Sequence, residues 1–263
     1  MKYVLVTGAY GGMGTATVKA LKEAGYFVFA LDKRVGEGEE NILPLQADLT
    51  DEESVKTAFL SVKERTDELF AIVHFAGIYH LNSLMEVTDD TFRRAFEINV
   101  GGAYRVNKIF LPLLKKGGRI MITTSELAPL DPLPFTGLYA VTKSALDKYA
   151  YSLRMEVQLL GISVSVLRPG AVQTDMLGVS TSDLDKFCEN TKLYACNATR
   201  FKRIVEGVEA KKVPAEKVAK KTLKILKAKH PRYVYNLNRN PLLRLLNVLP
   251  CRMQTWIIKQ VLK

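Results

Sequence analysis

The chain reads Thr7-Gly8-Ala9-Tyr10-Gly11-Gly12-Met13-Gly14 near its start, with four glycines in eight residues. The stretch follows a short apolar run, Tyr3–Val6, and opens a segment of helical spacing, Met13–Ala24. A tight strand-to-helix turn explains one glycine but not four. Glycines here let the backbone approach a pyrophosphate, which the free N–H groups at the start of a helix bind. The stretch therefore predicts a dinucleotide site.

Strand-like and helix-like segments alternate along the rest of the chain. Thr50 is expected to cap the helix at 51–65, with Glu53 completing a capping box. The alternation implies right-handed βαβ units. We therefore expect an α/β fold, a Rossmann-type doubly wound parallel sheet of about seven strands with helices on both faces. The remaining expected strands are 26–31, 41–47, 70–75, 119–124, 162–167 and 233–235, and the remaining helices are 88–114, 138–160 and 216–229.

Composition excludes several classes of protein. With 263 residues, 48% hydrophobic and 25% charged, the chain is neither disordered nor collagen-like nor of low complexity. No compositional break marks a linker, so we expect one domain over residues 1–263. Residues 176–213 interrupt the alternation of strand-like and helix-like segments. They are expected to form a substrate-loop insertion over the ligand crevice. A C-terminal tail occupies about 240–263.

Cysteine usage and hydropathy indicate a cytoplasmic protein. No apolar run approaches the ~18 residues of a spanning helix, and the apolar N-terminus is too short for a signal peptide. Cys188, Cys196 and Cys251 form neither a CxxC pair nor an even disulfide set. These features favour a reducing cytoplasm and predict no metal site.

The net charge of +11 is unevenly distributed. Residues 200–263 carry 17 Lys and Arg against three acidic residues, whereas the first 199 residues have a net charge of −3. A basic region of this kind suits nucleic acid, an anionic membrane or an acidic substrate. We favour the simpler alternative, a solvated helical face, and expect no nucleic-acid partner because aromatic residues do not interleave with the basic ones.

Acidic residues follow the second and third expected strands. A carboxylate at Asp32 can accept both ribose hydroxyls of an adenosine and would repel a 2′-phosphate, whereas Lys33 and Arg34 could attract that phosphate. We expect NAD as the cofactor in preference to NADP. Asp48 and Leu49 are expected to border the adenine, with helix capping by Asp48 as an equal alternative.

Tyr139 and Lys143 lie four residues apart on an expected helix and therefore share one face. A tyrosine with a pKa of about 10 is a poor base, and a nearby ammonium lowers that pKa. The hydroxyl of Ser125, just past the fifth strand, could bind the reacting oxygen. Tyr-x-x-x-Lys alone is a chance pattern typical of an exposed pair. Chance becomes a poor explanation once the glycine stretch, Asp32 and Ser125 occur in register with it.

Five motifs in this order resemble the single-domain short-chain dehydrogenase/reductases. The resemblance covers Lys2 to about Met176 well and the remainder loosely. The motifs are Thr7-Gly8-x-x-x-Gly12-x-Gly14, Ala76-Gly77, Asn99, Ser125 with Tyr139-x-x-x-Lys143, and Pro169-Gly170-x-Val172-x-Thr174.

The resemblance implies a role for each matching residue. Tyr139 is then the general acid/base, Ser125 orients the substrate oxygen, and Lys143 lowers the tyrosine pKa while holding the ribose. Asn99 holds a water of a proton relay, in keeping with a local helix irregularity. Residues and resemblance together predict these nucleotide contacts: Gly8, Tyr10, Gly11, Gly12, Met13, Gly14, Asp32, Asp48, Leu49, Ala76, Gly77, Tyr139, Lys143, Pro169, Gly170, Val172 and Thr174.

The sequence departs from the family pattern before Ala-Gly, where His74 and Phe75 replace two asparagines. We interpret His74 as a satisfied core histidine rather than an extra acid/base. His80 is expected to be a solvated loop residue. Glu126, beside Ser125, either shapes the pocket or pairs with a cation.

The tail loosely resembles the endings of hydroxysteroid and retinol dehydrogenases. Pro250 suits the first turn of a last helix. Its basic residues fall on one side and its apolar residues opposite: Arg252, Lys259 and Lys263 against Ile257, Ile258 and Val261. The alternatives are a lid over an apolar substrate, an interfacial membrane helix, or a helix packed on its own domain, which we favour.

These features predict an NAD(P)-dependent oxidoreductase that interconverts a secondary alcohol and a ketone. The expected substrate is hydrophobic, such as a steroid, bile acid or other lipid, and the expected assembly is a homodimer or homotetramer. The alternative is a non-catalytic dinucleotide-binding or sensing protein of the same fold. The intact set of Ser125, Tyr139 and Lys143 disfavours it.

Overall fold

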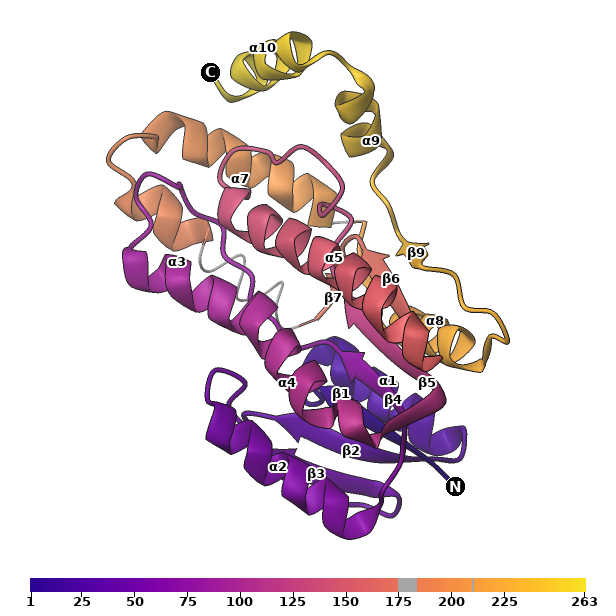
Figure 1. The fold of residues 1–263 in the computed structure, drawn as a ribbon. Coiled ribbons are helices and arrows are strands. Elements are labelled where there is room, and N and C mark those ends of the chain that lie inside the picture. The colour runs from indigo at the N-terminus through magenta and orange to yellow at the C-terminus, as the bar shows by residue number, and fades with distance from the viewer. Residues whose placement is uncertain (175–183, 210) are drawn as a thin grey trace.

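A computed structural model describes residues 1–174, 184–209 and 211–263 (Figure 1). Its centre is a seven-stranded sheet in the order β3-β2-β1-β4-β5-β6-β9, in which every neighbouring pair is parallel. The strand order reverses between β1 and β4, and such reversals open a crevice at the carboxyl ends of the strands. The strands are β1 (Lys2–Thr7), β2 (Tyr26–Asp32), β3 (Ile42–Gln46), β4 (Leu69–His74), β5 (Leu114–Thr123), β6 (Ser163–Pro169) and β9 (Val234–Leu237).

Helices cover both faces of this sheet, as the sequence predicts (Figure 1). One face packs on α1 (Gly12–Glu23) and α8 (Ala215–Lys227), and the other packs on α2 (Glu52–Arg65), α4 (Gly102–Phe110) and α5 (Gly137–Val157). Each central strand serves both cores because its side chains alternate between the faces. The buried stretches of β1, β2 and β4 are therefore mostly apolar, which is typical of a parallel sheet.

The helix expected at 88–114 is wrong as one continuous element. It consists of α3 (Asp89–Phe96), a π-helical turn (Glu97–Gly101) and α4, and a 3-10 turn (Leu111–Leu113) then leads into β5 at Leu114. The irregularity expected around Asn99 is confirmed, because that residue lies in the π-helical turn. Thr88 caps α3 as expected, accepting a hydrogen bond from the Thr91 N–H at 3.2 Å.

The cap expected for α2 is also wrong. Asp51, not Thr50, accepts the N–H of Glu53, at 3.0 Å. Thr50 instead donates both its N–H and its hydroxyl to Asp48 Oδ1, at 3.0 and 2.7 Å. Thr50 is therefore hydrogen-bonded to Asp48 and does not cap the helix, although the capping-box pattern predicts that it does.

Helical elements occupy the described part of the segment expected as an insertion, although its residues 176–183 and 210 lie outside the described chain. A two-stranded sheet of β7 (Val172–Gln173) and β8 (Val213–Pro214) closes the segment at its base. Residues 184–190 and α7 (Ala195–Glu209) form a third apolar cluster, which includes Leu184, Phe187 and Phe201.

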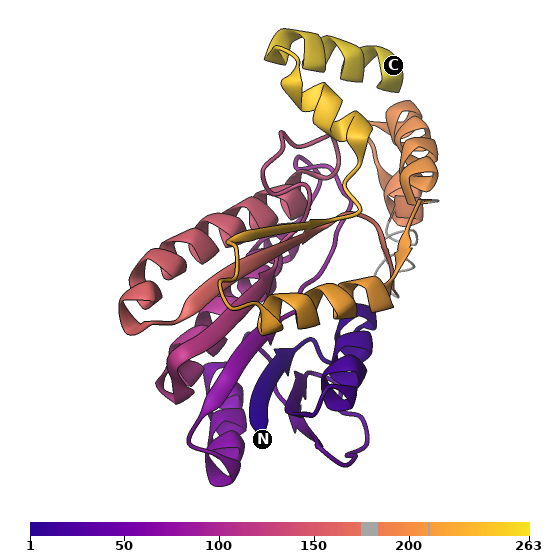
Figure 2. The same cartoon turned by 90° about the vertical axis from the view of Figure 1, so that its right-hand side faces the viewer.

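The tail forms two helices, α9 (Pro241–Val248) and α10 (Cys251–Leu262). Figures 1 and 2 show both helices at the end of the molecule opposite the N-terminus, with α10 near α7. Ile258 and Leu262 of α10 join the third apolar cluster, so this helix packs on its own chain as we expected. Within the described part of the chain, no helix combines the length and the apolarity that a membrane span requires.

His74 is a satisfied core histidine, which confirms its interpretation. Its ring nitrogens lie 3.4 Å from Thr7 Oγ1 and 2.9 Å from Asn107 Oδ1, and Asn107 Nδ2 donates to the hydroxyl of Tyr149 at 3.1 Å. Burial lowers the pKa of His74 to about 4, because the protonated ring loses its hydration.

We expect this histidine to make the fold sensitive to acid. Between pH 6.5 and 4 the unfolded chain protonates His74 while the folded chain does not, so stability falls as the pH falls. At pH 5 this costs about 2 kcal/mol relative to pH 7. The substitution His74→Asn removes this titration, so its free energy of unfolding should fall less between pH 7 and 5 in urea titrations. Equal pH dependence in both proteins would contradict the assignment.

Candidate functional site

The glycine stretch forms a cradle at the carboxyl end of β1. Gly8 has a φ of +66°, and a Cβ there would lie 2.5 Å from the backbone nitrogen of Ala76. A Cβ at Gly14 would lie 2.0 Å from the carbonyl oxygen of Gly8. Gly11 is the N-cap of α1 and provides no side-chain cap, so the first N–H groups of the helix remain open to a ligand. The cradle fits a pyrophosphate.

A cleft of about 760 Å³ runs from this cradle across the carboxyl ends of β1, β2 and β4. It brings together eleven of the predicted nucleotide contacts, namely Gly8, Gly11, Gly12, Met13, Gly14, Asp32, Asp48, Leu49, Ala76, Gly77 and Thr174. Tyr10 does not line this cleft, and its ring lies against Gly36. The cleft thus combines the glycine cradle with the carboxylate of Asp32, as a dinucleotide site requires.

Asp32 is held in place at one end of the cleft. Its Oδ2 accepts the N–H of Tyr10 at 3.0 Å, and its Oδ1 accepts the N–H of Arg34 at 3.2 Å. The ammonium of Lys33 lies 2.7 Å from Asp48 Oδ2. Hydrogen bonds from Lys33 and Thr50 lower the pKa of Asp48 to about 2. Asp48 therefore neutralises the cation that could otherwise attract a 2′-phosphate.

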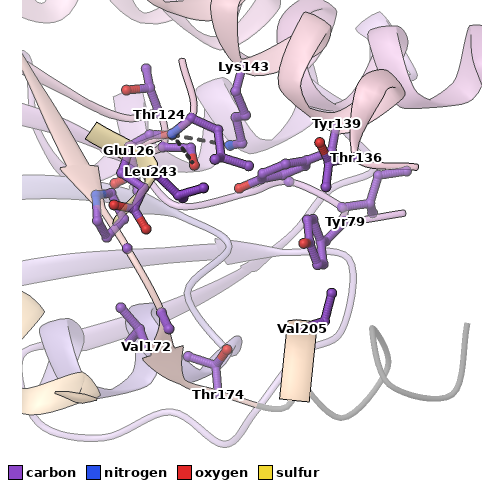
Figure 3. A pocket seen from close by; sticks show the side chains of 18 of the residues that line it. Tyr79, Thr124, Glu126, Thr136, Tyr139, Lys143, Val172, Thr174, Val205 and Leu243 are labelled. Carbon is purple, nitrogen blue, oxygen red and sulfur yellow. Dashed lines mark hydrogen bonds between the residues drawn. The ribbon is translucent and has the colours of Figure 1, made fainter. Parts of the chain in front are cut away.

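A second, apolar cavity of about 190 Å³ adjoins the cleft and shares Met13, Gly77 and Thr174 with it. Figure 3 shows Tyr139 and Lys143 reaching this cavity from α5, with Tyr79 close to Tyr139. Ser125 reaches the same cavity from the end of β5. Three further predicted contacts, Pro169, Gly170 and Val172, also line this cavity.

Tyr139 and Ser125 line the same cavity. Burial raises the pKa of Tyr139 to about 12, although the neighbouring Ser125 hydroxyl opposes this rise. The sequence predicts a lowered pKa, but in the protein alone the desolvation of the phenolate outweighs other effects. The ring of Tyr79 meets that of Tyr139 edge-on, with centroids 4.3 Å apart.

Lys143 is buried beside this tyrosine. Its Nζ lies 5.7 Å from the centroid of the Tyr139 ring and donates a hydrogen bond to the carbonyl of Thr123 at 3.2 Å. Burial lowers the pKa of Lys143 to about 8. The lysine thus retains an ammonium at neutral pH in a site that disfavours the charge.

Asn99 links the π-helical turn to the loop after β4. Its Oδ1 accepts the N–H of Ile78 at 2.7 Å, while its Nδ2 donates to the carbonyl of Ile78 and to Thr142 Oγ1, both at 3.0 Å. A Cβ at Gly77 would lie 3.1 Å from Asn99 Oδ1 and 3.4 Å from Lys143 Nζ. Gly77 therefore leaves space between these two polar groups.

The ion pair between Arg168 and Asp147, which joins β6 to α5 beside the site, was not predicted from the sequence. Arg168 donates from Nε and Nη2 to the two carboxylate oxygens of Asp147, at 2.9 and 2.6 Å. Thr124 Oγ1 donates to the same carboxylate at 3.1 Å. One available signal was the spacing, since Asp147 lies one helical turn after Lys143 and Thr124 immediately precedes Ser125.

Glu126 connects the site to the tail. Its carboxylate lines the apolar cavity and accepts the N–H of Asn240, the cap residue of α9, at 2.6 Å. Burial raises the pKa of Glu126, while the charge of Arg239 opposes that rise. Glu126 therefore lines the pocket, as the first alternative has it, and its hydrogen bond joins it to a backbone N–H. The bond also places Leu243 in the cavity wall, where the sequence had not predicted it.

Comparisons with known proteins agree with this geometry. The family model described as short chain dehydrogenase matches residues 2–185. Estradiol 17-beta-dehydrogenase 2 of Mus musculus is 35% identical over 190 residues, which is 67% of this chain and 50% of that protein. The chain thus spans about half the length of this relative. The 3-amino-tetrahydro-pyrrolizinone reductase of Xenorhabdus hominickii is 31% identical over 246 residues, covering 89% of this chain and 86% of that protein.

Solved structures share the fold. A 3-ketoacyl-(acyl-carrier-protein) reductase from Brucella melitensis, complexed with NADH, superposes with a TM-score of 0.73 at 21% identity, over 89% of this chain and 96% of that one. A short chain dehydrogenase family protein from Francisella tularensis gives 0.74 at 22% identity, over 90% and 96%. The extent of the family match and the ordered motifs identify the chain as a member of the short-chain dehydrogenase/reductase family.

Proposed function

We propose that the protein is an NAD(P)-dependent oxidoreductase that interconverts a secondary alcohol and a ketone. One observation carries the proposal: Ser125, Tyr139 and Lys143 converge in an apolar cavity that opens onto the nucleotide cleft. A substrate in the cavity and a nicotinamide near Thr174 would be neighbours.

Each residue has a distinct role in this mechanism. Ser125 holds the substrate oxygen, and Tyr139 gives it a proton during ketone reduction or takes one during alcohol oxidation. The ammonium of Lys143 favours the phenolate of Tyr139 and binds the ribose. Asn99 supports the loop at Ile78 and holds a relay water. The nicotinamide, when bound, supplies or accepts the hydride.

The cofactor we propose is NAD. The Asp32 carboxylate is fixed by two backbone N–H groups, and Lys33 is already paired with Asp48. An anionic 2′-phosphate would therefore meet a fixed negative charge without help from Lys33. Val172 and Thr174 would hold the carboxamide of the nicotinamide.

The substrate we propose is hydrophobic, such as a steroid, bile acid or other lipid. The cavity walls come from apolar side chains of α7 and α9 and of the loop after β5. Relatives named for estradiol and versicolorin are compatible with a ring system of this kind. The apolar part of the wall includes Leu127, Leu133, Phe201, Ile204, Val205 and Leu243.

A homodimer or homotetramer in the cytoplasm completes the proposal. One end of α5 and the turn after it expose large side chains that a second copy would cover, namely Tyr151, Met155, Leu159 and Leu160. The three cysteines are free, which suits a reducing compartment. Residues 1–263 would act as one domain, with the sheet, the cavity and the tail contributing to one site.

The alternative function is dinucleotide binding without catalysis. Burial destabilises the phenolate of Tyr139 and the ammonium of Lys143. A protein that only binds a dinucleotide has no need to keep such a pair in its cavity. The intact set therefore favours an enzyme.

The first prediction concerns Tyr139→Phe. Loss of the proton donor should reduce kcat by at least about 10³-fold. The Kd for NADH should change less than about threefold, since the phenol is not essential for cofactor binding. Tyr151→Phe, an exposed tyrosine on the same helix, is the matched control. Turnover within a few-fold of wild type would exclude the mechanism, and absence of turnover in every screen would favour the sensor.

The second prediction concerns Asp32→Ser. Without the carboxylate, kcat/KM for NADP relative to NAD should rise at least about tenfold, because repulsion of the 2′-phosphate is removed. Asp67→Ser removes a surface carboxylate that pairs with Lys63 and serves as the control. An unchanged ratio of the two kcat/KM values would mean that Asp32 does not contact the ribose.

The third prediction concerns Lys143→Met. A pKa of about 8 in place of 10.5 means that burying the ammonium costs about 3 kcal/mol at pH 7. The variant should therefore be inactive yet melt several degrees higher than wild type without nucleotide. The folded chain releases this proton as the pH rises from 8 to 10.5, so the difference in Tm should shrink over that range. The matched control is Lys148→Met, an exposed lysine on α5. A lower Tm for Lys143→Met at pH 7 would contradict the argument.

A further inference from the structure

The two tail helices leave a group of large apolar side chains exposed. Val248 is 82% exposed and Trp256 is 63% exposed, although each lies on a well-formed helix. Soluble proteins rarely gather so many without a partner that covers them. The group, which we term the tail face, comprises Leu242, Leu245, Val248, Met253 and Trp256.

Contacts on the inner side of α10 fix its part of the tail face outward. Ile258 and Leu262 pack into the third apolar cluster, and the carbonyl of Leu262 accepts a hydrogen bond from Asn197 Nδ2 at 2.6 Å. Gln254 donates to Asp131 Oδ2 at 3.2 Å. Since α10 is held along one side, Trp256 on the opposite side cannot turn inward without breaking these contacts.

Basic residues share the outward side of α10. Arg252, Trp256, Lys259 and Lys263 follow one another at intervals of four, three and four residues, which places them on one helical face. The sequence had predicted this basic side, but the structure adds the tryptophan to it.

The charge around the tail has one sign. Residues 217–263 contain twelve Lys and Arg and no Asp or Glu. Among the described residues, Glu126 and Asp131 bring carboxylates to the tail, and both are engaged there: Glu126 accepts the N–H of Asn240, and Asp131 accepts from Gln254. The tail face is therefore apolar and cationic together.

We propose that the tail face binds an anionic lipid surface, with α9 and α10 lying in the headgroup region. Exposed apolar side chains beside cations, with a tryptophan between them, match the chemistry of that region, where aromatic rings reside and Lys and Arg attract acidic headgroups. A second copy fits this face poorly. A two-fold contact would set Arg252, Lys259 and Lys263 against the same cations of the other copy.

The position of α9 also affects substrate access, an inference that rests on the proposed function. Leu243 of α9 lines the substrate cavity, whereas its neighbours Leu242 and Leu245 belong to the tail face. A membrane-bound tail would therefore set one wall of the cavity against the lipid, and an apolar substrate could enter from there.

Trp256 makes the proposal directly measurable because it is the single tryptophan of the chain. The full chain is titrated with phosphatidylcholine vesicles that contain or lack phosphatidylglycerol. We expect a blue shift of the tryptophan emission, protection from iodide quenching and co-sedimentation, all with the anionic vesicles and all weakened by salt. These readouts do not depend on turnover, so failure of membrane binding is distinguishable from failure of the proposed reaction.

Paired variants separate the apolar and the charged contributions. Leu245→Gln with Val248→Gln should weaken vesicle binding about tenfold or more, because two exposed apolar contacts are lost. Arg252→Glu with Lys259→Glu should weaken it by more than about tenfold. The matched control is Lys220→Glu with Lys224→Glu, which makes the same charge change on exposed positions of α8 and should retain most binding. Thermal melting verifies that each variant is folded.

Three outcomes would overturn the proposal. The first is no binding to anionic vesicles by the folded wild-type chain. The second is an equal loss of binding in the α8 control, which would indicate a diffuse charge effect. The third is a Trp256 emission already shielded without vesicles, together with a lower mass in light scattering for Leu245→Gln with Val248→Gln. That result would show that a second copy covers the tail face.

Discussion

Asp147 accepts hydrogen bonds from Arg168 and Thr124, and through them one carboxylate joins α5, β6 and the end of β5. The hydroxyl of Tyr233 adds β9 to the same group by donating to the carbonyl of Asp147 at 2.9 Å. The Arg168 and Asp147 side chains are 15% and 13% exposed, so removing one partner should cost part of the roughly 3–5 kcal/mol that breaking a fully buried pair costs. The contact also sets the separation between the strand end that carries Ser125 and the helix that carries Lys143.

The candidate site that these hydrogen bonds position contains groups that destabilise the folded state. Burial opposes the phenolate of Tyr139 and the ammonium of Lys143, and each side chain keeps few polar partners within the protein. Proton chemistry requires such groups in a dry cavity, where their charges act strongly on a reacting oxygen. Rigid packing elsewhere must offset that cost. The buried network of His74, Asn107 and Tyr149 belongs to that packing and lies outside the candidate site.

The substrate cavity is completed by parts of the chain that are distant in sequence. Its polar centre follows β5 and α5, whereas α7 and α9 contribute the apolar wall. Glu126 connects the two halves by accepting the N–H of Asn240. The same tail that closes the cavity also carries the exposed apolar and basic surface. Binding at that surface would therefore act on the substrate wall first and leave the nucleotide cleft unchanged.

Local patterns were sufficient to predict the parallel sheet and the polar centre of the site. The glycine stretch and the apolar strands act through backbone geometry and periodicity, so Gly8, Asp32, Ser125, Tyr139 and Lys143 could be placed at one edge of the sheet before any contact was known. The π-helical turn was foreseen only as an irregularity at Asn99. The expected helix cap at Thr50 was wrong because Asp48, two residues away, competes for the same hydroxyl.

Contacts between distant segments had no such local pattern. The pairing of Asp147 with Arg168 and the bond from Asn240 to Glu126 join residues 21 and 114 positions apart. These bonds and the position of Leu243 in the cavity wall depend on packing of the finished fold. The pKa of Tyr139 also depends on the tertiary structure. Sequence spacing showed which charge lies nearby, but only three-dimensional burial established that desolvation outweighs that charge.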